Sequence, residues 1–270
     1  MDEFSAWLGR SEQRTDRLDP ARANALLAAL GRPAELKEGD ALPSLFHWLH
    51  FWDVRPPAET GVDGHPRRGG FLPPVALPRR MWAGGRLIFR QPLRLGDTVR
   101  RVSTIASIEE KAGRSGTLVF VAVRHELHGA DGLAIDEDQD LVYRELGPAA
   151  ADGPAEPMAV AVESVEPDPV LLFRYSALTM NSHRIHYDRP YAVEQEYYPG
   201  LVVHGPLQAT MLALLAERQL GAPLTSFRFR GVSAAIADER LDLHAEPGEN
   251  DLDLWTSQSG RRRMVASATG

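Results

Sequence analysis

The sequence of 270 residues contains no cysteine. This absence excludes disulfides, thiol nucleophiles and cysteine-ligated metals, and it is compatible with a reducing compartment. No stretch approaches the roughly 20 apolar residues of a membrane span, and the acidic start at residues 1–5 is unlike a signal or transit peptide. We therefore expect a soluble, cytoplasmic protein that does not contact a membrane.

The sequence also lacks a positive net charge, because 30 basic residues stand against 37 acidic ones. A nucleic-acid partner is therefore not expected, and a phosphate-bearing ligand would need local arginines. A Gly-rich phosphate loop, a GxSxG elbow and a Rossmann fingerprint are all missing, so a nucleotide cofactor is not indicated. Apolar residues make up 43% of the chain, which is ample for buried cores.

One segment divides the chain into two similar halves. Residues 147–157 are rich in Ala, Pro and Gly and have no apolar period, which is typical of a linker on the surface. We expect an N-terminal unit at 1–146, a linker at 147–168 and a C-terminal unit at 169–270.

A weak repeat indicates that the halves are copies of one unit. Leu87–Arg90 and Phe227–Arg230 occupy corresponding places in the two halves. In the first half, residues 100–108 and 117–127 are rich in β-branched residues and are separated by a hairpin signal. A third strand is expected at 134–145.

The clearest helix is expected at 203–220, where Pro206 suits the first turn and Gly221 the end. A helix followed by strands that must cover it, twice over, predicts an α+β fold in which an antiparallel sheet wraps around a helix. The first copy is expected to be degenerate, because residues 71–85 contain three prolines and hold at best a short helix.

The run Tyr175–Asp188 carries most of the chemical information, because it places Asn181 five residues before His186. A Gly-Pro step, Gly205-Pro206, then opens the apolar helix. Together these residues would supply a base that handles water and a pocket that stabilises an anion, which a hydratase requires.

This run resembles the hydratase motif of the MaoC-like hot-dog enzymes, in which an acidic or amide residue sits five before an invariant histidine. With Trp48–Asp53, Gly69–Trp82 and Gly96-Asp97, the chain is similar to the type 2 hydroxyacyl-thioester dehydratase branch, which includes itaconyl-CoA and 3-methylfumaryl-CoA hydratases. The resemblance covers all but the first thirty or so residues and 147–168. It implies a double hot-dog fold with one active site.

In such an enzyme His186 is the expected general base and acid. Asn181 would hold the attacking water through its amide, which transfers no proton; the alternative is a residue that only stabilises a turn. MaoC-like enzymes more often have aspartate here. Either His186 does all the proton transfer, or a carboxylate such as Asp188, Glu194 or Asp53 reaches in.

Gly205 is the expected oxyanion donor, because a backbone N–H at a helix N-terminus carries partial positive charge. The alternative is that Gly205 only caps the helix. His204 beside it either lines the pocket or serves as a cap or surface residue.

Itaconyl and methylfumaryl groups carry a free carboxylate that a guanidinium can bind. Arg184 is the first candidate, Arg79 and Arg80 compete with it, and a surface role is the alternative for each. His183 is also assigned to the substrate site. Although His183 and His186 are three residues apart, no cysteine and no clear third ligand accompany them, so no metal is predicted.

Two further clusters have ordinary and functional interpretations. Residues 47–53 form either a packed core edge with polar tips or a wall of the acyl pocket. The run 261–263 forms either a solvated turn or a contact to a phosphate of CoA.

We therefore expect a hydro-lyase that interconverts itaconyl-CoA or 3-methylfumaryl-CoA with citramalyl-CoA, with CoA as part of the substrate and no separate cofactor. A (3R)-hydroxyacyl-thioester dehydratase of fatty-acid metabolism is the first alternative, and it predicts a deep apolar groove through the degenerate half. A small dicarboxylate instead predicts a shallow pocket with a buried arginine. A thioesterase and a non-catalytic acyl-CoA-binding module are further alternatives, and a homodimer is possible.

Overall fold

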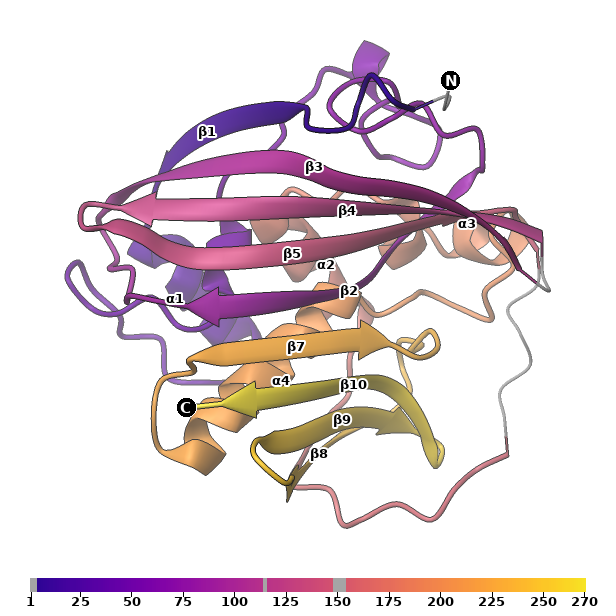
Figure 1. The fold of residues 1–270 in the computed structure, drawn as a ribbon. Coiled ribbons are helices and arrows are strands. Elements are labelled where there is room, and N and C mark those ends of the chain that lie inside the picture. Colours follow the sequence, from indigo (N-terminus) through magenta and orange to yellow (C-terminus); the bar gives the residue numbers. More distant parts are fainter. Residues whose placement is uncertain (1–3, 114–115, 148–153) are drawn as a thin grey trace.

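The computed structural model describes residues 4–113, 116–147 and 154–270, and ten strands in this part of the chain form one antiparallel sheet (Figure 1). The strand order is β1-β3-β4-β5-β2-β7-β10-β9-β8-β6. The N-terminal half contributes β1 Ser11–Arg17, β2 Arg79–Phe89, β3 Thr98–Gly113, β4 Gly116–Gly129 and β5 Gly132–Arg144. The C-terminal half contributes β6 Glu163–Val165, β7 Ser226–Gly231, β8 Leu241–Pro247, β9 Leu252–Gln258 and β10 Arg261–Thr269. The expected hairpin is β3–β4, and the expected third strand is β5.

The helices gather on one side of this sheet (Figure 1). They are α1 Pro20–Ala29, α2 Pro169–Thr179, α3 Arg189–Glu194 and α4 Gly205–Leu220, with three short 3₁₀ turns, η1 Phe46–Leu49, η2 Pro57–Glu59 and η3 Arg184–His186. Within the described ranges, no helix combines the length and the apolar character needed to cross a membrane.

The two halves repeat the same strand order outward from a central seam between β2 and β7. In each half an edge strand leads into a helix that starts at an Asp-Pro step, where Asp19 caps α1 and Asp168 caps α2. Across the seam, Leu87 of β2 lies opposite Phe227 of β7. The repeat seen in the sequence therefore marks the two central strands, which pair with each other.

Helix α4 is the central helix that the sequence predicts, although it begins at Gly205, two residues later than expected. Leu207, Ala209, Leu212 and Ala216 are fully buried where α4 packs against the strands of the C-terminal half. Gly221 ends the helix in the left-handed conformation. The predicted antiparallel sheet around a helix is confirmed.

No described helix of comparable length covers the inner face of the N-terminal sheet. Residues 71–78 form no helix, and the chain enters strand β2 at Arg79. Phe71, Leu72 and Val75 instead pack against Val121 and other side chains of β4 and β5. The inner face is thus covered by irregular chain, and space remains beside α4.

Parts of the predicted linker have regular structure. Residues 148–153 lie outside the described residues, whereas Glu163–Val165 form the edge strand β6 and pair with β8. The sheet continues through both halves, so the division at 146 and 169 stays a prediction.

The seam predicts a difference between two of its glycines. A Cβ atom on Gly84 would lie 2.7 Å from the backbone oxygen of Phe229, whereas one on Gly231 would have an ordinary contact of 3.5 Å. We expect Gly84→Ala to lower the free energy of unfolding by about 1–3 kcal/mol, and Gly231→Ala to leave it nearly unchanged. Urea unfolding of both variants tests this, and equal effects would contradict it.

Candidate active site

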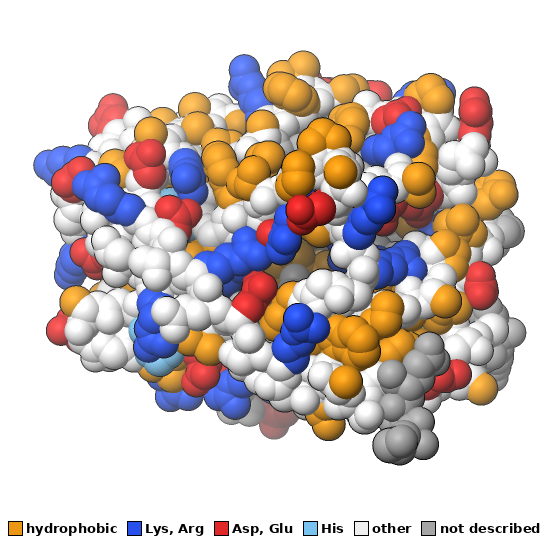
Figure 2. Space-filling model, turned by 90° about the horizontal axis from the view of Figure 1, so that it is seen from above, with side chains coloured by type: hydrophobic (Ala, Val, Ile, Leu, Met, Phe, Trp, Pro, Cys, Tyr) orange, Lys and Arg blue, Asp and Glu red, His pale blue; other side chains and the backbone are white. Residues whose placement is uncertain are grey.

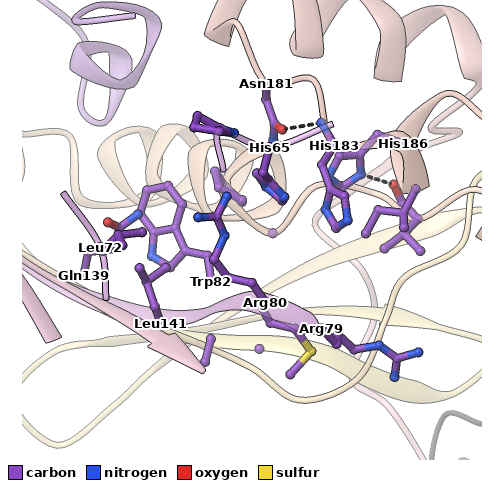
Figure 3. Close-up of a pocket in the computed structure, with 18 of the residues that line it drawn as sticks. His65, Leu72, Arg79, Arg80, Trp82, Gln139, Leu141, Asn181, His183 and His186 are labelled. Carbon is purple, nitrogen blue, oxygen red and sulfur yellow. Dashed lines mark hydrogen bonds between the residues drawn. The ribbon is translucent and has the colours of Figure 1, made fainter. Parts of the chain in front are cut away.

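A cavity of about 800 Å³ lies beside the N-terminus of α4. Its walls come from β2, β5, residues 65–72, residues 181–186 and the first turn of α4 (Figure 3). On the face shown in Figure 2, basic and acidic side chains surround a hollow. Of the predicted site residues, the cavity is lined by Arg79, Arg80, Asn181, His183, His186 and Gly205, but not by Arg184 or His204.

His186 is held in one tautomer by the backbone. Its Nδ1 lies 2.7 Å from the carbonyl oxygen of Val202, which can only accept, so Nδ1 carries the proton and Nε2 is the free acceptor. Burial, with a smaller effect from His183, lowers the pKa of His186 to about 3. The ring is therefore neutral at neutral pH and can accept a proton, and the imidazolium that forms readily gives it up.

The His204 ring packs against the ring of His186. It is fully buried, its ring stacks on that of His186 with centroids 3.6 Å apart, and its Nε2 lies 2.8 Å from the Ser176 hydroxyl. It occupies the N-cap position of α4, but its side chain forms no capping hydrogen bond. Of the alternatives considered for His204, the buried ring is thus neither a surface residue nor a capping side chain.

The position of Asn181 is compatible with both roles considered for it, stabilising a turn and holding a water molecule. Its Oδ1 accepts a hydrogen bond from the backbone N–H of His183 at 3.0 Å, which stabilises a turn (Figure 3). The same side chain lines the cavity, and its amide nitrogen forms no hydrogen bond with the described residues. Its amide N–H groups are thus available to a water or ligand.

Gly205 is the first residue of α4 and lies at the cavity wall. A Cβ atom at this position would meet only Met264 and the backbone of Trp82, both at 3.8 Å, so the fold itself leaves room for a side chain. The missing side chain instead leaves the backbone N–H at the helix N-terminus open to a ligand.

A buried polar network forms the next part of the wall. His183 Nε2 lies 3.2 Å from Glu196 Oε1, and Arg79 Nε donates to Glu196 Oε2 at 3.2 Å. Arg79 also donates to the backbone oxygens of Glu196 and Gly147 and lies over Tyr198. The Arg79 guanidinium therefore already has hydrogen-bond partners within the protein. Among the described residues, no group of three or more His, Asp or Glu side chains is placed to hold a metal ion.

Two residues at the site were not predicted from the sequence: His65, which lines the cavity, and Glu196, which binds His183. The ring of His65 lies 4.2 Å from that of His183, its Nδ1 lies 3.2 Å from Asp63 Oδ2, and burial holds its pKa well below the usual value. Glu196 follows the end of α3, so neither residue belongs to a spacing pattern. Only the fold brings residues 63–65 against 183–196.

The three carboxylates considered in the sequence lie elsewhere. Asp188 caps α3 and pairs with Arg184, and Glu194 is exposed at the end of α3. Asp53 lines the outer part of the cavity and pairs with Arg14 and Arg55. Two other carboxylates bind imidazoles here, Glu196 at His183 and Asp63 at His65, each at 3.2 Å.

The three candidate arginines have different surroundings. Arg184 pairs with Asp188, donates to Val62 O and lies over Tyr191, outside the cavity. Arg79 is held by Glu196. Arg80 lines the cavity, and no carboxylate among the described residues forms an ion pair with it. Figure 3 shows Arg80 near His65, whereas Arg79 turns away.

The two remaining clusters are also placed. Residues 46–49 form η1, where His47 and Trp48 both bind Glu137, as expected for a core edge with polar tips, while Trp48 and residues 50–53 also line a second pocket. Residues 261–263 begin β10 after a turn, and Arg263 lines the cavity and donates to the Ser233 hydroxyl. A contact from this run to CoA stays a prediction.

The family model described as hydroxyacyl-thioester dehydratase type 2 matches residues 45–237. The chain belongs to this family. It is 46% identical to the mesaconyl-C(4)-CoA hydratase of Chloroflexus aurantiacus over 93% of this chain and 92% of the relative. Membership places the protein among the hydratases and dehydratases of acyl thioesters, as the resemblance implied.

Solved structures show the same fold. A MaoC-like dehydratase matches with a TM-score of 0.73 and 14% identity, covering 98% of each chain. A Mycobacterium tuberculosis protein with a double hot-dog fold matches with a TM-score of 0.57 and 15% identity, covering 97% of this chain and 95% of that one. The predicted double hot-dog is thus confirmed.

The burial of His186 predicts a pH effect on stability. Its pKa is about 3 in the folded protein and about 6.5 when unfolded. As the pH falls below about 6.5, the unfolded chain binds a proton that folded His186 does not, so stability decreases. From pH 7 to 5 this one group costs about 1–2 kcal/mol.

His186→Gln keeps a side-chain N–H for Val202 but cannot titrate. The loss of stability between pH 7 and 5, measured by urea unfolding, should be smaller in this variant than in the wild type by that amount. Identical losses in the two proteins would contradict the assigned neutral ring.

Proposed function

We propose that the protein adds water reversibly to 3-methylfumaryl-CoA to give citramalyl-CoA. The observation that carries this proposal is one cavity that contains a neutral, backbone-anchored imidazole, an open helix N-terminus and an arginine without a carboxylate partner. The similarity to a mesaconyl-C(4)-CoA hydratase supports it, because mesaconyl-C4-CoA and 3-methylfumaryl-CoA are two names of one thioester.

Each group has a role in this reaction. The N–H of Gly205 donates to the thioester oxygen, while Asn181 and His186 Nε2 hold a water molecule near the β-carbon. His186 removes a proton as the water oxygen bonds to the β-carbon, and the electrons of the double bond move toward the thioester. The enolate oxygen is stabilised at the N-terminus of α4. His186 then returns the proton to the α-carbon.

The substrate carboxylate is bound by Arg80 in this proposal. Arg79 and Arg184 are already paired with Glu196 and Asp188, so neither is available without breaking an ion pair. The planar guanidinium of Arg80 in the cavity wall matches a carboxylate bound through two oxygens. Arg80 is therefore preferred over Arg184 as the residue that binds the substrate carboxylate.

The chemistry favours 3-methylfumaryl-CoA over itaconyl-CoA. In 3-methylfumaryl-CoA the double bond is conjugated with the thioester carbonyl, so water addition builds negative charge on the oxygen that Gly205 faces. In itaconyl-CoA with the thioester on the methylene arm, this conjugation is absent. The N-terminus of α4 then stabilises the transition state less, and hydration should be slower.

The first experiment incubates the purified protein separately with 3-methylfumaryl-CoA, itaconyl-CoA and crotonyl-CoA. Chromatography with mass detection follows each hydroxyacyl-CoA, and free thiol is measured in the same samples. The expected product is citramalyl-CoA, formed fastest from 3-methylfumaryl-CoA. A preference for crotonyl-CoA would support the fatty-acyl alternative, and thiol release would indicate a thioesterase. Binding without turnover would indicate a non-catalytic module.

Substitution of Arg80 tests the carboxylate contact. We expect Arg80→Leu to lower the ratio of kcat/KM for 3-methylfumaryl-CoA over that for crotonyl-CoA by at least about thirtyfold, because a charged partner in a buried pair is lost. Arg184→Leu is the matched control and should leave the ratio unchanged. A fall in the control and none in Arg80→Leu would return the role to Arg184.

Substitution of Gly205 tests the oxyanion donor. Because the fold leaves room for a methyl group here, Gly205→Ala should keep the melting temperature of the wild type. The methyl group would fill the space that the ligand needs, so kcat/KM for 3-methylfumaryl-CoA should fall by about a hundredfold. Normal activity in a normally folded variant would contradict the assignment. The homodimer and the cytoplasmic location stay predictions.

A further inference from the structure

A second pocket of about 340 Å³ lies in the N-terminal half, where the inner face of the sheet has no long helix. Trp82, Gln139, Asn181 and Pro206 line both this pocket and the catalytic cavity, so the two spaces adjoin. An acyl group that extends past Asn181 would therefore enter the second pocket. Here the fatty-acyl alternative requires an apolar groove.

Part of the wall of this pocket is polar and charged, beside aromatic and aliphatic side chains such as Phe51, Phe71 and Val123. Glu137 is buried, and its two oxygens lie 3.0 Å from His47 Nε2 and 2.9 Å from Trp48 Nε1. His125, also in the wall, bonds to Ser103 and Gln139. The carboxylate of Glu137 and both ring nitrogens of His125 thus have partners within the protein and do not need a ligand.

Arg101 of β3 differs from these neighbours. It lies in the pocket wall with its guanidinium 4.9 Å from the ring centre of Phe51, and it has no hydrogen bond or ion pair with the described residues. Burial lowers the pKa of Arg101 below its usual value, and the charge of Arg14 adds to this, while the more distant charges of Glu137, Glu12 and Asp53 act in the opposite direction. Arg14 itself is bonded to Asp53 and Trp52 O.

A second donor in the wall also has no acceptor. His50 Nδ1 lies 3.2 Å from an Arg22 nitrogen and must accept that bond, so Nε2 carries the proton. This Nε2 is shielded from water and has no partner among the described residues. Of these two groups, the Arg101 guanidinium is the one that suits a ligand with acceptors and negative charge, because His50 Nε2 is shielded.

We infer that this pocket is a carboxylate-binding subsite, in which Arg101 binds the distal carboxylate of a longer dicarboxylic enoyl-CoA. This inference rests on the proposed hydratase reaction at His186. A saturated alkyl chain in the same place would remove water from an unpaired guanidinium, which is costly. The subsite therefore accepts a chain that ends in a carboxylate and rejects the same chain that ends in a methyl group.

The test compares 2,3-dehydroadipyl-CoA with trans-2-hexenoyl-CoA, which have the same chain length and differ only in the terminal carboxylate. The wild type should hydrate the dicarboxylic substrate with the larger kcat/KM. In Arg101→Leu this kcat/KM should fall by at least about thirtyfold, while that for trans-2-hexenoyl-CoA should rise. A misfolded variant cannot produce the rise. Arg100→Leu, an exposed neighbour on β3, is the matched control.

The result separates this inference from the proposed function. A wild type that hydrates 3-methylfumaryl-CoA but prefers trans-2-hexenoyl-CoA over 2,3-dehydroadipyl-CoA would overturn the subsite alone. Equal losses on both six-carbon substrates in Arg101→Leu would also overturn it. A wild type that hydrates none of these thioesters would overturn the proposed reaction.

Discussion

The pairing of β2 with β7 is the constraint on which the site depends. It joins two half-sheets into one and places the N-terminal end of β2, with Arg80 and Trp82, beside the first turn of α4. Each half alone would have an unpaired sheet edge at this seam. In the proposed reaction the imidazole of His186 comes from one half and the guanidinium of Arg80 from the other, so the proposed active site exists only when the seam forms.

The two halves use the same sheet for different purposes. In the C-terminal half, α4 fills the inner face with Leu and Ala side chains. In the N-terminal half, the corresponding face carries Glu137, His125 and Arg101, and no long helix covers it among the described residues. With no long helix in the described part of this half, a pocket remains there, and we infer that its polar side chains select the acyl groups that enter.

Regular patterns explain what the sequence could predict. The apolar period of α4, the β3–β4 hairpin and the repeat at Leu87 and Phe227 depend on local order, and all three are found. His186 and Gly205 could be placed by their motif. His65, Glu196 and Arg101 could not, because their surroundings arise from chain segments distant in sequence. The ion pair between Arg184 and Asp188 was also not predicted, although the two residues are only four apart in the sequence.

The most direct test of the central claim follows the atoms of water. The reaction with 3-methylfumaryl-CoA is run in deuterium oxide enriched in ¹⁸O, and the products are analysed by mass spectrometry. The account predicts citramalyl-CoA with an intact thioester, one ¹⁸O in the new hydroxyl and one deuterium on the α-carbon. ¹⁸O in a released free acid, with CoA as a free thiol, would contradict it.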